Sequence, residues 1–72
     1  MDVVALFGTN VRKHRLARGW SQEELAFRAG LKRSYLSDIE RGHRNPTIRA
    51  LGRIAAALEV SSAALLACPD PN

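Results

Sequence analysis

The chain has one cysteine, few aromatic residues and no long apolar run, and each shortage excludes a class of protein. Cys68 is the single cysteine among 72 residues, so no internal disulfide can form and a cytoplasmic location is expected. No apolar run approaches the roughly 20 residues of a membrane span, and no basic segment followed by an apolar core opens the chain. We therefore expect neither membrane insertion nor export.

Aromatic and catalytic side chains are too sparse for two further classes. Aromatic residues make up 6% of the chain, too few for the stacking surfaces that bind single-stranded RNA. His14, His43 and Cys68 lie in three different predicted elements without the spacing of metal ligands. No glycine-rich phosphate loop and no Ser-His-acid set is present. We expect no enzymatic activity, no metal and no cofactor.

Positive charge is abundant but unevenly distributed. The net charge is +4, and all eleven Lys and Arg residues fall between Arg12 and Arg53, with only four acidic residues among them. From Ile54 onward there is no basic residue. The basic part suggests a polyanionic partner and the apolar end suggests a protein partner. The alternative is that the basic excess only keeps the chain soluble.

Periodicity and capping residues predict an all-α chain of five helices. No segment alternates with period two, and Gly or Pro interrupts the chain at short intervals. The predicted helices are about 3–17, 22–29 and 33–40, a fourth capped by Thr47 and a fifth capped by Ser61. The length predicts a single domain, residues 1–68, followed by a flexible tail at 69–72.

Three local features refine this outline. Ser21 and Glu24 have the spacing of a capping box, in which each side chain bonds the other residue's amide. Gly30 is expected in the left-handed conformation, which turns one helix sharply into the next. In the fourth helix one apolar face should be buried. Its members are Ile48, Leu51, Ile54, Ala55 and Leu58.

The two short helices joined through residues 29–31 have the spacing of a helix-turn-helix. The similarity extends to five strings: Ser21–Ala26 (SQEELA), Ala29–Leu31 (AGL), Arg33–Ser37 (RSYLS), Ile39–Gly42 (IERG) and Arg44–Thr47 (RNPT). Together they closely resemble the Cro and phage-repressor family, of the xenobiotic-response-element type. The resemblance covers about residues 7–66 and implies five helices, of which the third enters the major groove of DNA.

By match to the family's base-contacting positions, the expected base readers are Arg33, Ser34 and Asp38. Arg33 can bond the O6 and N7 atoms of guanine with both prongs of its guanidinium group. Asp38 can accept from a cytosine amino group or orient Arg33 or Arg41. The alternative for Asp38 is simple pairing within the helix, with Arg41 or Ser34.

Residues that flank the recognition helix are expected to bind phosphates, which fix register without carrying sequence information. They are Gln22, Lys32, Tyr35, Ser37, His43, Arg44, Asn45 and Thr47. For Tyr35, the ring can instead pack against the second helix, and both roles can hold at once. Lys32 stands where the family commonly has a capping Ser or Thr, and Glu59 stands where it usually has Gly. If that position has the left-handed conformation that favours Gly, Glu59 is strained by about 1 kcal/mol.

Glu40 lies in the last turn of the third helix, where the helix dipole disfavours an anion. Arg15 lies on the inward side of the first helix, four residues after Val11. In the resembling family a matched pair of this kind forms a partly buried ion pair, so we expect Arg15 and Glu40 to form one. The alternative is two exposed charges that contribute little.

The C-terminal part of the chain is the expected dimer interface. The residues are Val60, Ala63, Ala64, Leu65 and Leu66. Leu65 and Leu66 are adjacent, so both can hardly point into one small core, and one should face a partner. The alternative is that both cover the monomer core from different sides.

Together these features predict a transcriptional regulator that binds double-stranded DNA sequence-specifically, as a homodimer on a palindromic operator. The small size resembles phage repressors and the controller proteins of restriction-modification systems, and it suggests no small-molecule effector. The alternative is a protein-binding module of the same fold, such as an antitoxin whose main partner is a toxin.

Overall fold

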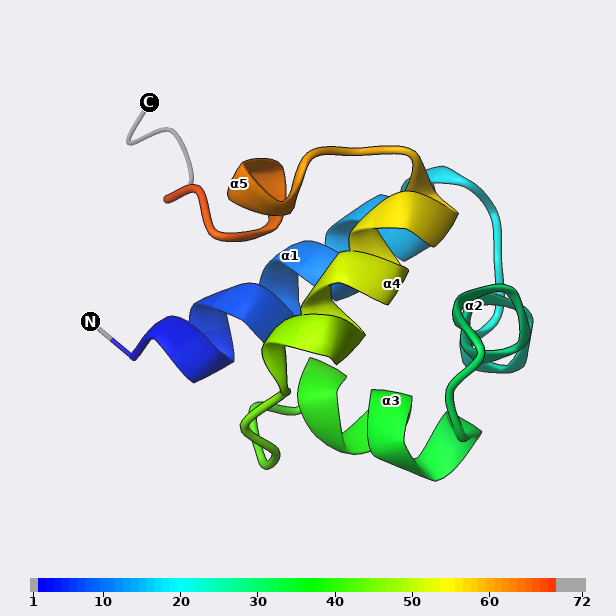
Figure 1. Cartoon of the computed structure of the whole chain (residues 1–72), viewed down its shortest axis with the longest axis horizontal. Coiled ribbons are helices and arrows are strands. Elements are labelled where there is room, and N and C mark those ends of the chain that lie inside the picture. Colours follow the sequence, from blue (N-terminus) through cyan, green and yellow to red (C-terminus); the bar gives the residue numbers. More distant parts are fainter. Residues whose placement is uncertain (1, 69–72) are drawn as a thin grey trace.

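The computed structural model describes residues 2–68, which fold into five helices joined by loops (Figure 1). They are α1 (Val3–Ala17), α2 (Gln22–Ala29), α3 (Arg33–Glu40), α4 (Ile48–Leu58) and α5 (Ser62–Leu65). Residues 2–68 contain no strand, and the predicted all-α fold class is confirmed. None of these helices is long and apolar enough to cross a membrane. The tail predicted at 69–72 lies outside the described residues.

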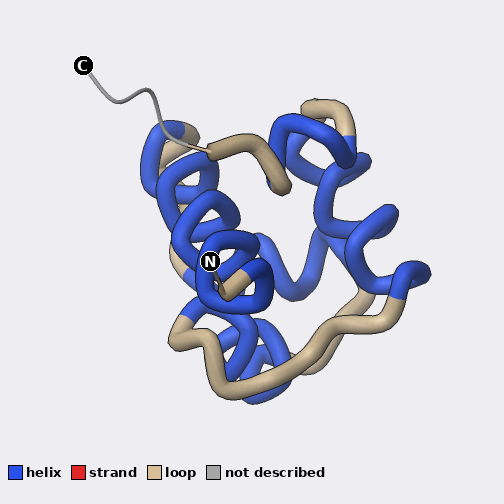
Figure 2. Tube along the Cα trace, turned by 90° about the vertical axis from the view of Figure 1, so that its left-hand side faces the viewer, coloured by secondary structure: helices blue, strands red, loops and turns tan. Residues whose placement is uncertain are grey.

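The helices pack so that α3 lies at one edge of the molecule. Helix α1 packs against α3, α4 and α5, and α2 packs against α3 and α4. In Figure 1, α3 runs along the lower edge and α5 lies at the opposite edge. Figure 2, viewed from the N-terminal end of α1, shows helices joined by loops throughout the described chain. This arrangement leaves one side of α3 facing outward.

The helix ends follow the predicted capping residues, with one difference. Ser21 and Thr47 accept hydrogen bonds from the amides of Glu24 and Ala50, both at 3.0 Å. The predicted capping box is only half formed, because the carboxylate of Glu24 accepts from Nε of Arg28 at 2.7 Å. An exposed i,i+4 ion pair is thus made in place of the reciprocal cap.

Both predicted left-handed residues are confirmed. Gly30, between α2 and α3, has φ 69°, and the amide of Leu31 donates to the Ala26 carbonyl at 2.9 Å. Glu59, at the end of α4, has φ 58°, a conformation that strains a residue with a side chain. Its carboxylate pairs with Arg18 at 2.9 Å, and this exposed contact offsets little of the strain.

The core contains one large side chain or more from every helix. The largest fully buried side chains are Phe7, Val11, Leu25, Leu36, Ile39, Ile54, Leu58 and Leu65. The prediction that Ile48 is buried with the rest of its face was wrong, because this side chain is 83% exposed. Ile48 is the first residue of α4, and the buried residues of that helix begin only at Ala50.

Gly8 and Asn10 of α1, which no motif in the sequence marks, position α3 and the end of α5 against α1. A Cβ atom at Gly8 would overlap the carbonyl oxygen of Ile39, so glycine allows the backbones of α1 and α3 to touch. Asn10 is buried and donates from Nδ2 to the carbonyl oxygens of Leu65 and Ala67, both at 2.9 Å. Asn10 thereby satisfies carbonyl groups at the end of the short α5.

Gly8→Ala is expected to destabilise the fold by about 1–3 kcal/mol, because the new methyl group forces α1 away from α3. Gly52→Ala is the matched control, since Gly52 is also helical but a Cβ atom there meets nothing within 4 Å. That substitution should stabilise by about 0.5–1 kcal/mol. Urea unfolding of both variants checks this, and equal effects would contradict the close approach at Gly8.

Candidate nucleic-acid interface

Helix α3 buries one side and presents the other to solvent. Leu36 and Ile39 have no exposed surface and anchor the helix in the core. Arg33 and Ser34 are exposed, which places both predicted base readers on the outward side. Asp38 is half-buried, and its Oδ1 accepts from Nη2 of Arg41 one turn further along. The structure therefore pairs Asp38 with Arg41, a contact common to the orienting role and to the alternative of simple pairing.

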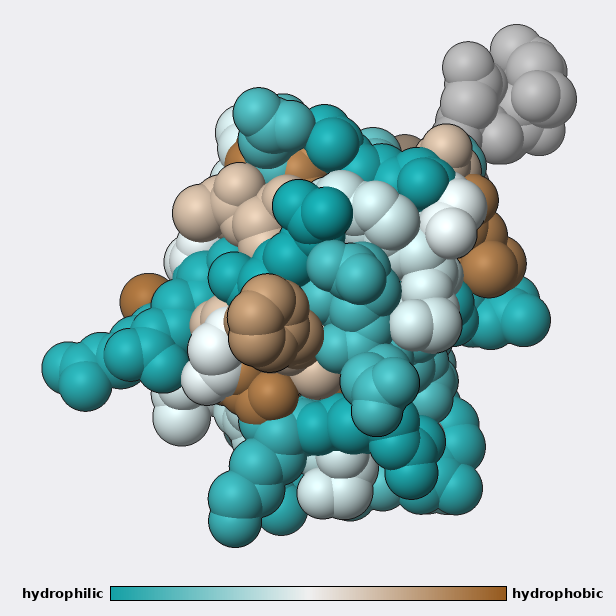
Figure 3. Space-filling view, turned by 90° about the vertical axis from the view of Figure 1, so that its right-hand side faces the viewer, coloured by the Kyte–Doolittle hydropathy of each residue, from teal (hydrophilic) through white to brown (hydrophobic). Residues whose placement is uncertain are grey.

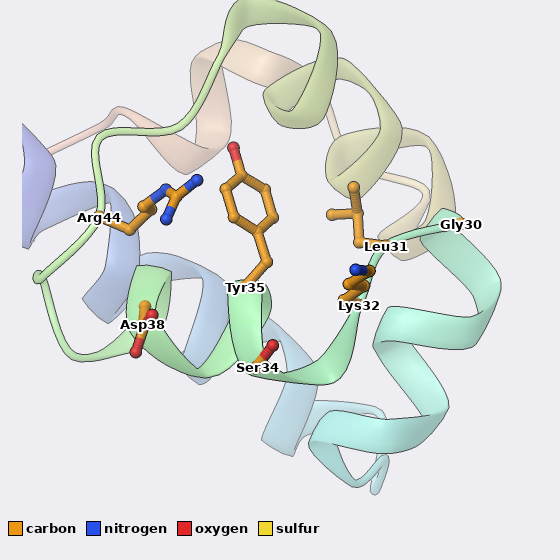
Figure 4. Close-up of a pocket in the computed structure, with 7 residues that line it drawn as sticks. All are labelled: Gly30, Leu31, Lys32, Ser34, Tyr35, Asp38 and Arg44. Atoms are coloured by element: carbon orange, nitrogen blue, oxygen red, sulfur yellow. The ribbon is translucent and has the colours of Figure 1, made fainter.

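A hollow of about 420 Å³ lies beside α3, at the turn that joins it to α2 (Figure 4). Its lining residues are Gly30, Leu31, Lys32, Ser34, Tyr35, Asp38 and Arg44. In Figure 4 the ring of Tyr35 stands between Arg44 on one side and Lys32 on the other. The two cations and the hydroxyl groups of Ser34 and Tyr35 suit an anionic ligand.

Tyr35 connects α3 to the loop at residues 41–47. The guanidinium carbon of Arg44 lies 5.0 Å from the centroid of the Tyr35 ring, and the Tyr35 hydroxyl accepts from the Thr47 amide at 3.3 Å. The ring is half-buried against the core. The hydroxyl thus reaches the N-terminus of α4, where amides and the helix dipole favour an anion.

The predicted phosphate-binding residues fall into two groups. Most surround the outer side of α3, and the exposed ones are Lys32, His43, Arg44, Asn45 and Thr47. Ser37 is half-buried on the same helix. Gln22 differs, because its Nε2 donates to Oε1 of Glu40 at 3.1 Å. Its side-chain amide supports the base of α3, a role that its position at the start of α2 did not reveal.

The predicted ion pair between Arg15 and Glu40 is present and buried. Arg15 Nε donates to Glu40 Oε2 at 2.7 Å, and Arg15 Nη2 donates to Oε1 at 2.9 Å. A third bond joins Arg15 Nη1 to the Trp20 carbonyl at 2.8 Å. The hydrogen bonds to Glu40 raise the pKa of Arg15, against the opposing effect of burial. The pair ties the C-terminal turn of α3 to α1 and to the start of α2.

The predicted dimer residues are not all available at the surface. Leu65 is fully buried in the monomer core, so its assignment to an interface was wrong. Val60 and Ala64 are half-buried, Ala63 is exposed, and Leu66 is 40% exposed. Of the two adjacent leucines, Leu66 is thus the exposed one and Leu65 belongs to the core.

An apolar groove that the sequence analysis missed lies next to Leu66, with a volume of about 190 Å³. Its lining residues are Val3, Val4, Phe7, Asn45, Pro46, Ile48, Leu51 and Leu66. Three segments meet there, the start of α1, the start of α4 and the end of α5, so no single periodicity marks it. Figure 3 shows the opposite side of the molecule, that of α2, where hydrophobic groups stand among hydrophilic ones.

Nothing in the described residues groups three or more His, Cys, Asp or Glu side chains in a way that could hold a metal. The hollow beside α3 is lined instead by the cations Lys32 and Arg44, the hydroxyl groups of Ser34 and Tyr35, and the carboxylate of Asp38. These can bind an anion and read hydrogen-bonding edges.

A family model described as helix-turn-helix matches residues 11–65. The chain belongs to the helix-turn-helix family. An uncharacterised helix-turn-helix transcriptional regulator of Sinorhizobium fredii is 43% identical over 70 residues, which are 97% of this chain and 91% of the relative. The restriction-modification controller protein C.AhdI of Aeromonas hydrophila has a similar crystal structure, with a TM-score of 0.84 at 42% identity, covering 86% of this chain and 94% of that one.

A further solved structure is that of the controller protein C.Esp1396I, a tetramer in complex with its natural 35-base-pair operator. It matches with a TM-score of 0.80 at 40% identity, over 88% of this chain and 83% of that chain. These similarities confirm the predicted family resemblance and the predicted class of function, transcriptional regulation by a helix-turn-helix protein.

Truncation of either Arg15 or Glu40 to Ala should destabilise by about 3–5 kcal/mol, because the remaining charge is left buried without its partner. A double-mutant cycle measured by urea unfolding should then show strong coupling. The pair of Asp38 and Arg41, whose side chains are 37% and 59% exposed, is the control at the same end of α3, with coupling below about 1 kcal/mol. Coupling as small for Arg15 and Glu40 as for the control would contradict a structural role.

Proposed function

We propose that this chain is a sequence-specific regulator of transcription that binds double-stranded DNA with α3 in the major groove. One observation carries the proposal: α3 is anchored by buried apolar residues while Arg33 and Ser34 project outward, with Lys32 and Arg44 flanking the hollow beside them. The major groove is about 12 Å wide and admits a helix with such an outer side. The match to C.Esp1396I, solved with its operator, supports this orientation.

The proposed roles divide between base reading and phosphate binding. Arg33 and Ser34 read base edges, and Asp38 contributes by holding Arg41 in place. The phosphate-binding residues are Lys32, Tyr35, Ser37, His43, Arg44, Asn45 and Thr47. Gln22 is left out of this set, because its amide bonds Glu40. We further propose that residues 1–68 act as one DNA-binding domain, in the cytoplasm and without a small-molecule effector.

Arg33→Ala should weaken binding to the preferred duplex by about 1–3 kcal/mol and relax the preference at one base pair. Arg44→Ala should instead weaken binding to all sequences alike and make the salt dependence shallower, because a phosphate contact is lost. Titrations of selected and random duplexes at several salt concentrations separate the two effects. If Arg33→Ala loses the same affinity on random DNA as on the preferred duplex, Arg33 does not read bases.

We also propose that the chain binds its operator as a two-fold homodimer. One recognition helix reads too few base pairs to single out a site among genomic competitors, whereas two helices one turn of DNA apart, about 34 Å, double the sequence read. The interface we assign is the apolar groove and its rim, centred on Leu66, Ile48 and Val3, all of which are exposed. Leu65 is excluded from it by its burial.

Leu66→Lys should shift the chain toward monomer and weaken operator binding, because a charge at the centre of an apolar interface loses its hydration. Leu16→Lys is the matched control, since Leu16 is 50% exposed on α1 and does not line the groove. Sedimentation equilibrium and the concentration dependence of the melting temperature report the oligomeric state. A wild-type chain that stays monomeric to high micromolar concentration would contradict the dimer.

The relatives also suggest a biological role. C.AhdI and C.Esp1396I are controller proteins of restriction-modification systems, and their likeness spans most of this chain. We propose that this chain regulates the promoter of its own gene, with its concentration and its dimerisation setting the occupancy of the operator. Footprinting at the promoter of its own gene tests this role, and the absence of a protected site there would contradict it.

A further inference from the structure

Two contacts join the recognition helix to the loop that follows it, and both are made by Tyr35. The guanidinium carbon of Arg44 lies over its ring, 5.0 Å from the ring centroid. Its hydroxyl oxygen lies 3.3 Å from the Thr47 amide nitrogen and accepts its hydrogen bond. Arg44 and Thr47 both belong to the loop at 41–47, so one side chain of α3 contacts two residues of that loop. Figure 4 shows the Tyr35 ring beside Arg44.

The Tyr35 ring is suited to hold Arg44 because the ring itself is fixed. It is half-buried and packs against the core, whereas Arg44 is exposed and pairs with no carboxylate among residues 2–68. A free arginine samples many rotamers, and binding a phosphate then costs the entropy of selecting one. A guanidinium group stacked on an aromatic face has already lost part of that freedom.

The hydroxyl contact acts on a different group. Thr47 is the N-cap of α4, and its Oγ1 accepts from the Ala50 amide at 3.0 Å. The Tyr35 hydroxyl accepts a hydrogen bond from the backbone N–H of Thr47 and so fixes the start of α4 relative to α3. The positive end of the α4 dipole is thereby held at a constant distance from the base-reading residues Arg33 and Ser34.

We propose that Tyr35 is a positioning residue that holds Arg44 and the N-terminus of α4 where they meet DNA phosphates. This inference rests on the proposed function and deepens it, because it names what sets the register between base reading and phosphate binding. Tyr35 acts here through Arg44 and Thr47, in addition to any contact that its hydroxyl makes with DNA.

Two substitutions separate the contacts. Tyr35→Phe keeps the ring and removes the bond to the Thr47 amide, whereas Tyr35→Leu removes both. In the DNA-free chain, NMR should show ring-current shifts of the Arg44 side-chain protons in wild type and Tyr35→Phe, but not in Tyr35→Leu. Hydrogen exchange of the Thr47 amide should be faster in both variants. Retained dispersion of the core methyl signals verifies that each variant is folded.

The decisive test is a double-mutant cycle on duplex DNA selected by the wild-type chain. Tyr35→Leu should lower affinity about two- to fivefold, the loss expected for an exposed cation–π contact. Arg44→Ala should lower the salt slope by about one. In the Tyr35→Leu background, Arg44→Ala should lower affinity by less than half as much as it does in the wild-type background, because Arg44 has already lost the aromatic ring that positions it. Tyr35→Phe should keep the wild-type salt slope.

Lys32→Ala provides the matched control, because Lys32 lines the same hollow, whereas the cation that lies over the Tyr35 ring is Arg44. Its effect should add to that of Tyr35→Leu. Additive effects of Tyr35→Leu and Arg44→Ala would overturn the proposal, as would a loss for Tyr35→Phe equal to that for Tyr35→Leu. If the wild-type chain selects no duplex, the proposed function fails, and unshifted Arg44 protons in the free chain would independently overturn the positioning role.

Discussion

The buried ion pair of Arg15 and Glu40 is the interaction on which the position of the recognition helix depends. It joins the last turn of α3 to α1 through two hydrogen bonds, and Arg15 also bonds the Trp20 carbonyl just before α2. Gln22, at the start of α2, adds a bond to the same carboxylate. A buried charge is costly unless fully paired, so the network tolerates one arrangement of these three helices and disfavours the others.

Backbone geometry completes this constraint. The glycine at position 8 lets α1 touch the carbonyl of Ile39, one residue before Glu40, so the ion pair and the close approach act on the same turn of α3. Gly30, at φ 69°, sets the angle between α2 and α3. Both ends of α3 are thus fixed by contacts on its buried side, so its solvent-facing side can carry hydrophilic residues. Tyr35 connects α3 in turn to the loop before α4, through its contacts with Arg44 and Thr47.

Features set by local chemistry could be predicted from the sequence, and features set by where segments meet could not. Capping residues and glycines predicted all five helices. The left-handed conformation at Glu59 was predicted from the Gly that the resembling family usually has there. The ion pair was predicted from the family resemblance. Ile48 shares a periodic face with buried residues yet is itself exposed, and the groove beside Leu66 forms only because three distant segments converge. Asn10 gave no local signal, since its partners lie 55 and 57 residues away.

Methylation interference on DNA selected by the chain tests the central claim, that α3 reads the major groove, most directly. Dimethyl sulfate modifies N7 of guanine, which lies in the major groove, and N3 of adenine, which lies in the minor groove. The account predicts that modified guanines block binding in two clusters, about one helical turn apart and related by two-fold symmetry. Interference confined to adenine N3, or failure to select any duplex from a random pool, would contradict it.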